Sequence, residues 1–282
     1  MRVAYLILAH ANPKQLQRLV NRLSHTSVDF YIHIDLKVAI QSFKPLMQQP
    51  NTFFVKNREK VRWGAYSIVQ ATVNGFEQII ASGINYQHIT LLSGQDYPLK
   101  CNSAILDFFK ANCDTAFMEF YTMNDVWTEA IPRLNKYYLT NYPFIGSHAI
   151  EIIINKLFTK RQPPVNLVFV GRSQWFSVTL PQAKYIIEEL ATNNSLRRYF
   201  KLTWGGDEFV FQTLLYNSPY KAEMVNNNLR YIDWSEKNAS PKTFTIADAA
   251  MLTQSNRLFA RKFDEKVDEI IMNHLDSICL GP

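Results

Sequence analysis

Two carboxylates follow two glycines in the segment Gly205-Gly206-Asp207-Glu208, just before an apolar run with helical spacing. Glycine has no Cβ atom, so another molecule can approach the backbone closely at such a segment. A carboxylate placed there can serve as a general base, which speeds a proton transfer by about 10²–10⁴-fold. A structural role is the alternative, because acidic residues at the start of a helix cap it and interact favourably with its dipole.

Cations near the carboxyl end of the chain form the second group of reactive residues. If a ligand carries phosphate groups and no metal is bound, cations and backbone N–H groups neutralise its negative charge. Lys242 and Lys262 are candidates, with Arg261 as an alternative to Lys262. Apolar neighbours on both sides of Lys262 favour a docked segment over the solvated position that most lysines occupy.

The usual signatures of cofactor and metal sites are absent from the sequence. It contains no Walker A loop, no Gly-x-Gly-x-x-Gly, no Gly-x-Ser-x-Gly and no His-Glu-x-x-His segment. The strand end at which an Asp-x-Asp pair would hold a divalent cation has Ser93-Gly94-Gln95-Asp96 instead. A single carboxylate is a poor site for Mg²⁺ or Mn²⁺, which favour several oxygen ligands. We therefore expect neither a metal nor another cofactor.

The elements that position these residues alternate between strands and helices in the first part of the chain. Apolar runs and helical periodicities predict strands over 3–9, 30–34, 52–55, 88–92 and 116–121, and helices from Pro13, over 65–82 and from Asn102. Such alternation implies an α/β fold with a mostly parallel central sheet flanked by helices. Ligands bind at the carboxyl ends of strands in such sheets, and these ends carry His10, Asp35 and Asp96.

The second half of the chain is less regular. It predicts strands over 167–170 and 174–179 on either side of Gly171-Arg172, a helix from Pro181 and a strand over 229–232. Because the sequence has no linker, repeat or low-complexity tract, we expect residues 1–282 to form a single domain.

A net charge of +6 and a pI of about 9.1 suit three kinds of partner: nucleic acid, an anionic membrane surface or phosphorylated small molecules. A basic surface without a special partner is the alternative. The cations are spread out, with one cluster at Lys156, Lys160 and Arg161, and form no run typical of a nucleic-acid-binding arm. We therefore expect no nucleic-acid partner.

Neither a membrane-spanning helix nor a signal peptide is predicted. No apolar run approaches the roughly 18 residues that a spanning helix needs, and no cleavage site follows the first apolar run.

Cys101, Cys113 and Cys279 are odd in number and scattered, so we predict free thiols in a reducing compartment. The expectation is a cytoplasmic protein, with the cluster of Lys156, Lys160 and Arg161 holding it peripherally at the inner face of an anionic membrane.

Seven segments of the chain occur in the order seen in a known enzyme family. They are 5–10, 31–37, 62–71, 91–100, 171–176, 206–209 and 258–264, of which Leu91-Leu92-Ser93-Gly94-Gln95-Asp96-Tyr97-Pro98-Leu99-Lys100 is the most distinctive. On these segments the sequence resembles the core-2/I-branching β-1,6-N-acetylglucosaminyltransferases. That family, glycosyltransferase family 14, also contains the peptide O-xylosyltransferases.

The resemblance implies a GT-A-like fold, a UDP-sugar donor, inversion at the anomeric carbon and no metal. It places the catalytic carboxylate on Glu208 and the diphosphate-binding cations on Lys242 and Lys262. Lys242 departs from the family, since the animal enzymes carry arginine there and lysine cannot make a bidentate fork with phosphate. Animal members also have a membrane anchor and several disulfides, so we expect a bacterial-type soluble member. The donated sugar would be N-acetylglucosamine or xylose, and the acceptor an oligosaccharide or glycolipid.

Residues 1–122, approximately, are expected to form a nucleotide-binding half, and residues 123–282 an acceptor and catalytic half. The first half would bind the nucleotide sugar through residues at or near strand ends, namely His10, Asp35, Trp63, Ser93 and Asp96. Core packing of Trp63 and closure of the following turn by Asp96 are the alternatives. Acceptor sugars would contact carboxylate, cationic and aromatic side chains, namely Glu119, Arg133, Tyr137, Trp175 and Trp234.

Three other functions remain open at this point. A glycoside hydrolase needs two carboxylates about 5–9 Å apart across the sugar, whereas the side chains of adjacent residues such as Asp207 and Glu208 normally diverge. A carbohydrate-binding protein without activity would retain the same site. A nucleic-acid-binding module has only the high pI in its favour, because the sequence lacks a recognition motif.

Overall fold

A buried apolar strand, β1 (Val3–Ala9), lies inside the larger sheet of the computed structural model, which describes residues 1–158 and 160–278. Its two neighbours, β2 (Val28–Ile34) and β4 (His88–Ser93), both pair with it in parallel, and β3 (Thr52–Phe54) pairs in parallel with β2. A strand that parallel neighbours and helices enclose is apolar on both faces, as β1 is. The carboxyl ends of these strands therefore meet at one edge of the sheet.

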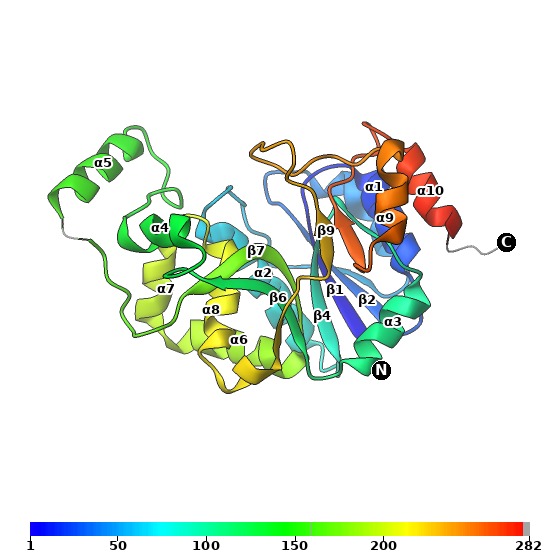
Figure 1. Ribbon diagram of the computed structural model, residues 1–282, viewed down its shortest axis with the longest axis horizontal. Coiled ribbons are helices and arrows are strands. Elements are labelled where there is room, and N and C mark those ends of the chain that lie inside the picture. The colour runs from blue at the N-terminus through cyan, green and yellow to red at the C-terminus, as the bar shows by residue number, and fades with distance from the viewer. Residues whose placement is uncertain (159, 279–282) are drawn as a thin grey trace.

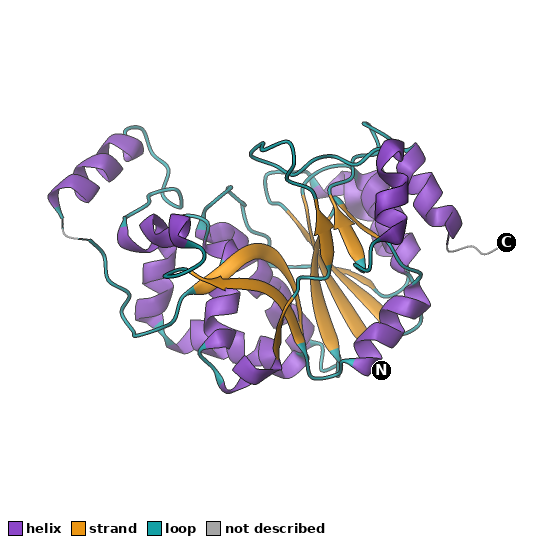
Figure 2. Cartoon of the chain, viewed as in Figure 1, coloured by secondary structure: helices purple, strands orange, loops and turns teal. Residues whose placement is uncertain are grey.

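Strands from the second half of the chain continue this sheet and curve away from its parallel part (Figure 2). β7 (Val170–Val178) pairs antiparallel with both β4 and β6 (Ala116–Thr122), and β8 (Met224–Asn226) pairs in parallel with β6. The order is β3-β2-β1-β4-β7-β6-β8. The predicted fold class, α/β with a mostly parallel sheet flanked by helices, is confirmed.

One predicted boundary in this region is wrong. Gly171-Arg172 was expected to separate two strands, but β7 runs through both residues. A Cβ atom at Gly171 would lie 2.3 Å from the carbonyl oxygen of Glu208. Glycine is therefore needed here because another backbone segment approaches the strand, and not because the chain turns.

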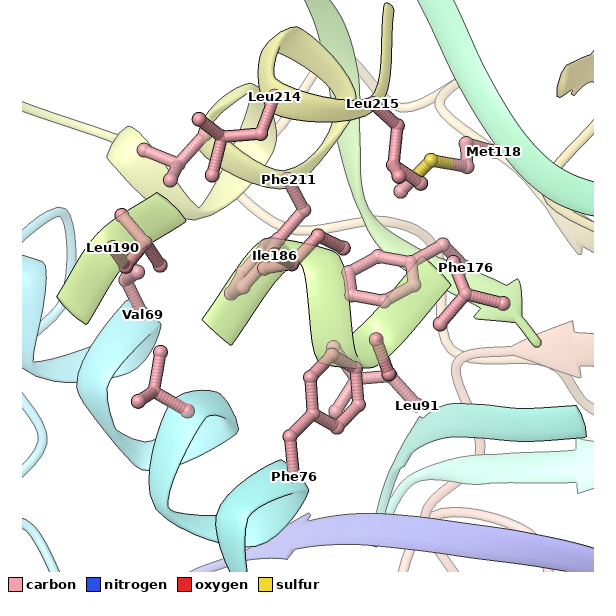
Figure 3. Packing of buried hydrophobic residues seen from close by; sticks show 14 of the residues in the cluster. Val69, Phe76, Leu91, Met118, Phe176, Ile186, Leu190, Phe211, Leu214 and Leu215 are labelled. Atoms are coloured by element: carbon pink, nitrogen blue, oxygen red, sulfur yellow. The ribbon is translucent and has the colours of Figure 1, made fainter. Parts of the chain in front are cut away.

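Helices cover both faces of the sheet (Figures 1 and 2). On one face, α2 (Tyr66–Ala81), α6 (Leu180–Thr192) and α8 (Val210–Tyr216) enclose a core. In this core the ring of Phe176 packs against those of Phe76 and Phe211, with centroids 6.1 and 5.1 Å away (Figure 3). The opposite face is covered by α1 (Pro13–Leu23), α3 (Asn102–Ala111), α9 (Ala249–Gln254) and α10 (Ile270–Ile278). The remaining α-helices are α4 (Ile131–Asn135), α5 (Ser147–Leu157) and α7 (Asn194–Lys201).

A second, three-stranded sheet returns the end of the chain to the first half. β10 (Phe259–Arg261) lies between β5 (Asp96–Pro98), with which it is antiparallel, and β9 (Arg230–Ile232), with which it is parallel. Because β5 directly follows β4, this sheet brings the C-terminal segment to the carboxyl ends of the parallel strands. The C-terminal segment therefore contacts the strands of residues 1–122 at this point.

The side chain of Gln15 on α1 joins the loop after β4 to the segment after β10 by hydrogen bonds. The side chain is fully buried, and its Nε2 donates to the carbonyl oxygens of Gly94 and Phe263, both at 3.0 Å. Its Oε1 accepts a hydrogen bond of 2.9 Å from the N–H group of Glu265. One amide thus satisfies three backbone groups from two distant segments, which is the usual condition for burying them.

The cysteines differ from the expectation. Cys113 is free and exposed, but Cys101 is disulfide-bonded, so the prediction of three free thiols is wrong at Cys101. Cys279 lies outside the described residues. Disulfides are rare in cytosolic proteins, so the cysteines no longer support a reducing compartment. Across residues 1–158 and 160–278, no helix has the length and apolar character needed to cross a membrane.

Replacing Gln15 by alanine should lower the free energy of unfolding by about 2 kcal/mol or more, since it leaves buried backbone groups without partners. Urea-induced unfolding measures this change through the transition midpoint. Gln17→Ala, on the partly exposed side of the same helix, is the matched control and should stay within about 0.5 kcal/mol of the unaltered chain. Equal midpoints for the two variants would contradict the role of Gln15.

Candidate active site

A cavity of about 360 Å³ opens at the carboxyl ends of β1, β2 and β4. This is the edge at which open α/β sheets bind ligands, and the volume suits a small molecule. Four residues predicted to bind the nucleotide sugar and one predicted to bind the acceptor line it: His10, Asp35, Trp63, Ser93 and Trp175. Trp63 is 71% exposed at the rim, which argues against the alternative of core packing.

Two polar side chains in the cavity wall are held by the loops that follow β2 and β3. The Asp35 carboxylate accepts a hydrogen bond of 2.9 Å from the Lys37 N–H group, and Lys37 Nζ lies 3.3 Å from its other oxygen. His33 accepts a hydrogen bond of 2.8 Å from the N–H group of Glu59 at Nε2. Burial lowers the pKa of His33 to about 4, so this ring is neutral near pH 7. Sequence reasoning missed His33, although it lies one position from the strand end within the segment 31–37.

Asp96 lies behind the cavity wall and is fully buried. Its carboxylate accepts hydrogen bonds from the N–H and hydroxyl groups of Ser93, at 3.1 and 3.0 Å, and pairs with Arg261 at 3.1 Å and Arg230 at 3.6 Å. Arg261 also donates to the Ser93 hydroxyl, and its guanidinium carbon lies 4.6 Å from the Trp175 ring centroid. Asp96 is therefore placed to orient Arg261. Of these two residues, Arg261 is the one that lines the cavity.

The two predicted phosphate-binding lysines lie on neighbouring segments. The N–H group of Phe244 donates to the carbonyl oxygen of Lys262 at 2.9 Å, which joins the segment of Lys242 to that of Lys262. Lys242 Nζ pairs with Asp248 at 2.6 Å, whereas the Lys262 ammonium forms no ion pair within the described part of the chain. Neither lysine is among the described residues that line the cavity, whereas Arg261 and Lys37 are.

Glu208 is held by an arginine between two tryptophans. Arg133 Nη1 donates to Glu208 Oε2 at 2.5 Å, and its guanidinium carbon lies 4.9 and 4.5 Å from the ring centroids of Trp127 and Trp204. Such stacking fixes the direction of the guanidinium. Gly205 makes room for it, since its φ of 66° favours glycine and a Cβ atom would lie 2.8 Å from Arg133 Nη1. Arg133, predicted to bind the acceptor, thus contacts the candidate base itself.

The Glu208 segment docks on the rim of the cavity. The rings of Trp63 and Trp204 meet edge to face with centroids 5.1 Å apart, and the Gly205 N–H group donates to the carbonyl oxygen of Gly64 at 2.8 Å. Gly64 has a φ of 70°, and a Cβ atom there would lie 2.3 Å from Trp204 Nε1. Glycines on both segments therefore permit this contact, which sets Glu208 beside the entrance to the cavity.

A second pocket of about 240 Å³ contains Glu119 and Trp234, two of the predicted acceptor residues, together with Tyr121 and Arg257. Glu119 accepts a hydrogen bond of 2.9 Å from Asn228 Nδ2. The pKa of Glu119 is raised by burial, against the lowering effect of Arg172 and Arg257, and the charge of Glu208 raises it further. The backbone of Glu208 also lies against Gly171 of β7, which pairs with Tyr121 in the wall of this pocket.

Two predicted acceptor residues lie elsewhere. Trp175 lines the larger cavity beside Arg261, and not the pocket of Glu119. Tyr137 lies outside both pockets, where its backbone exchanges two hydrogen bonds of 2.7 Å with the side chain of Asn155 and its ring lies 5.0 Å from the Arg161 guanidinium. Residue type alone suggested Trp175 and Tyr137 as acceptor residues. The tertiary structure decides that Trp175 lines the larger cavity and that Tyr137 lies in neither pocket.

Helix capping does not account for the two acidic residues after Gly206. The turn Gly206–Glu208 and the helix α8 that follows have no side-chain cap among the described hydrogen bonds. Asp207 is instead buried, and burial, reinforced by the adjacent charge of Glu208, raises its pKa to about 7.

Within residues 1–158 and 160–278, no three His, Cys, Asp or Glu side chains gather as a metal site would require. Metal independence stays a prediction.

The fold and the site define an α/β protein with a ligand cavity at its strand ends and an arginine-bound carboxylate at the cavity rim. The chain belongs to the Core-2/I-Branching enzyme family of glycosyltransferases, whose model matches residues 3–256. The resemblance inferred from the seven segments, and the GT-A-like fold type that came with it, agree with this membership.

Individual relatives are more distant. Xylosyltransferase 2 of Rattus norvegicus is 26% identical over 304 residues, which cover 98% of this chain and 33% of that protein. The xylosyltransferase of Ciona intestinalis is 23% identical over 298 residues, covering 98% of this chain and 34% of that protein. The chain thus spans about a third of the length of these curated relatives. Mouse xyloside xylosyltransferase 1, in its apo form, aligns over 92% of this chain and 96% of its own with a TM-score of 0.41 and 10% identity, which is too low to support an argument.

Asp207 should make the stability of the protein depend on pH. The folded pKa of about 7 exceeds the unfolded value of about 3.9, so the folded state retains a proton that the unfolded state has lost, and stability falls as pH rises from about 4 to about 7. Asp207→Asn should reduce the loss of unfolding free energy between pH 5 and pH 7.5 by roughly 2 kcal/mol. Urea titrations at both pH values test this, with the exposed Asp107→Asn as matched control. An unchanged slope in Asp207→Asn would contradict it.

Proposed function

We propose that the chain transfers N-acetylglucosamine or xylose from a UDP-sugar to a hydroxyl group of a glycan acceptor, with inversion and without a metal. The observation that carries the proposal is the position of Glu208 between two pockets. Its segment docks on Trp63 and Gly64 at the rim of the larger cavity, and its backbone lies against Gly171, which pairs with Tyr121 in the wall of the smaller pocket. A base in this position has a donor site on one side and an acceptor site on the other.

The larger cavity is the proposed donor site. Asp35 offers carboxylate oxygens to the N–H group of uracil or to ribose hydroxyls, and the exposed ring of Trp63 offers a stacking face at the rim. His10 and Ser93 supply further polar groups at the same strand ends. The xylosyltransferase names of the relatives favour UDP-xylose as the first donor to test.

In this proposal, cations of the C-terminal segment neutralise the negative charge that develops on the leaving diphosphate. Arg261 lies at the cavity with its direction set by Asp96, Ser93 and the ring of Trp175. A cation held in advance by buried partners needs no reorganisation when charge develops, which is the main source of electrostatic catalysis. Lys262 is next to Arg261, and Lys242 lies on the neighbouring segment. Both are proposed as further phosphate contacts.

Glu208 acts as the general base in this proposal. The acceptor hydroxyl gives its proton to the carboxylate while its oxygen forms a bond to the anomeric carbon, and the bond from that carbon to the phosphate oxygen breaks, so that UDP leaves with the electron pair. Arg133 engages Oε2 and so orients the carboxylate toward the acceptor. An oligosaccharide or the head of a glycolipid would lie against Trp234 and Glu119.

Glu208→Gln should reduce the rate of transfer by at least about a hundredfold, because the amide cannot accept the proton. UDP affinity should change little, since Glu208 does not line the donor cavity within the described residues. Single-turnover transfer from UDP-xylose and UDP-N-acetylglucosamine to sugar acceptors measures the first effect, and calorimetry the second. Glu188→Gln, exposed on α6, is the matched control. Normal turnover in Glu208→Gln would remove Glu208 as the base.

Calorimetric titration with UDP and with uridine, in the presence of EDTA, tests the donor site directly. UDP should bind despite the chelator, and Lys262→Ala should weaken UDP by about tenfold or more while changing uridine little, because the lost contact is to phosphate. Lys110→Ala, exposed on α3, serves as the control. Equal losses for both ligands would refute the phosphate contact, and strict dependence on added Mn²⁺ would overturn metal independence.

A further inference from the structure

The helix α5 projects from the body of the molecule beside α4 (Figure 1) and buries none of its side chains. Ile152, Ile153 and Leu157 are 54%, 52% and 74% exposed. A helix on the surface of a globular protein normally turns its apolar stripe toward the core. The apolar residues of α5 therefore lack the partner that such a stripe requires.

The polar side of α5 is the side that holds it to the protein. Glu151 Oε2 accepts a hydrogen bond of 2.7 Å from the N–H group of Leu139. One turn further, the Asn155 side chain exchanges hydrogen bonds with the backbone of Tyr137. The usual polarity of a surface helix is thus largely reversed, with polar contacts inward and Ile150, Ile152 and Ile153 outward, while Ile154 is partly buried. This arrangement is costly in water unless a nonpolar partner covers the outer side.

Residues on either side of the helix enlarge this exposed surface. We call it the α5 surface, and it comprises the exposed side chains of Phe144, Ile145, Ile150, Ile152, Ile153, Leu157 and Phe158. Scattered exposed apolar residues are common, but seven within fifteen positions are not. Such concentrations mark sites where proteins contact other proteins or membranes.

The charges around the α5 surface identify the partner. Lys156 and Lys160 are exposed, and the sole acidic residue between positions 142 and 160 is Glu151, which is tied inward. A surface that combines bulky apolar side chains with lysines and no outward carboxylate complements an anionic lipid bilayer. A two-fold contact with a second copy would bring the same lysines together without acidic partners.

Arg161, the third member of the predicted basic cluster, does not belong to this surface. It is buried, and its guanidinium donates to the carbonyl oxygens of Lys136, Tyr199 and Leu202 at 2.8, 2.6 and 2.6 Å. The expectation that Arg161 touches a membrane is therefore wrong. Its charge serves to close the base of the α4–α5 segment, and the outward cations are the two lysines.

We propose that the α5 surface docks on an anionic lipid bilayer, with the helix lying in the interface between headgroups and acyl chains. Eleven residues are too few to span a membrane, which takes about 20, but suffice for an interfacial helix. Peripheral binding of this kind is the form that the expected location at the inner face of a membrane would take. The segment 136–146 joins α5 to α4, which carries Arg133, so docking keeps the Glu208 site close to the lipid surface.

Co-sedimentation of the full chain with vesicles tests the proposal without any transfer assay. Binding should be at least about tenfold stronger to phosphatidylcholine vesicles that contain phosphatidylglycerol than to phosphatidylcholine alone, and should weaken as salt is added. The double variant Ile153→Ser/Leu157→Ser should lose at least about tenfold in binding. Lys156→Gln/Lys160→Gln should lose the preference for the anionic lipid. Val267→Ser/Ile270→Ser, a pair of equally exposed apolar residues near the C-terminus, is the matched control.

Far-ultraviolet circular dichroism of each variant confirms that it is folded. UDP titration separates this proposal from the proposed function, because docking does not require the donor site. Vesicle binding without UDP binding would leave docking intact while removing the transferase proposal. No binding of the unaltered chain to either vesicle, or equal binding by Ile153→Ser/Leu157→Ser, would overturn docking. So would a stable dimer in light scattering that this double variant converts to a monomer, since a second copy would then be the partner.

Discussion

The buried carboxylate of Asp96 is the constraint around which the two halves of the chain assemble. A charge removed from water is tolerated only when it is paired and hydrogen-bonded, so Asp96 at the end of β4 requires its arginine partners. Arg230 comes from β9 and Arg261 from β10, both more than a hundred positions away. The small sheet that carries them must therefore pack against the parallel strands. In doing so it delivers a cation to the cavity that the strand ends form.

Close backbone approach is the second constraint, and it concerns the Glu208 segment. Three glycines, Gly64, Gly171 and Gly205, stand where a Cβ atom would collide with Trp204, Glu208 or Arg133. Each lies on a different segment, so the site closes only when the three segments come together. The ion pair of Arg133 with Glu208 then depends on the same packing, because the two tryptophans that hold the guanidinium belong to it. The position of the Glu208 carboxylate and the stability of the fold are linked in this way.

The helix α5 is held differently from the rest of the protein. Its side-chain contacts are polar, through Glu151 and Asn155, while Ile152, Ile153 and Leu157 face outward. The rest of the chain buries apolar groups and exposes polar ones, as folding in water requires. The helix α5 reverses this order and is joined to α4, which carries Arg133. Whatever covers α5 therefore lies close to the Arg133–Glu208 pair. The proposed bilayer is such a cover.

The sequence by itself determined the fold class and most strands and helices of residues 1–122, because apolar runs and helical periodicities are local properties. The runs at 3–9 and 88–92 became β1 and β4 almost residue for residue. The ordered segments also led to the family and to Glu208 as the candidate base. Only the tertiary structure decided that Arg261 and Trp175 line the larger cavity while Asp96 lies behind it, and that Tyr137 and Arg161 are held by contacts outside both pockets. The reason is physical: the role of a charged or aromatic side chain depends on the partners it meets, and those partners come from segments far away along the chain.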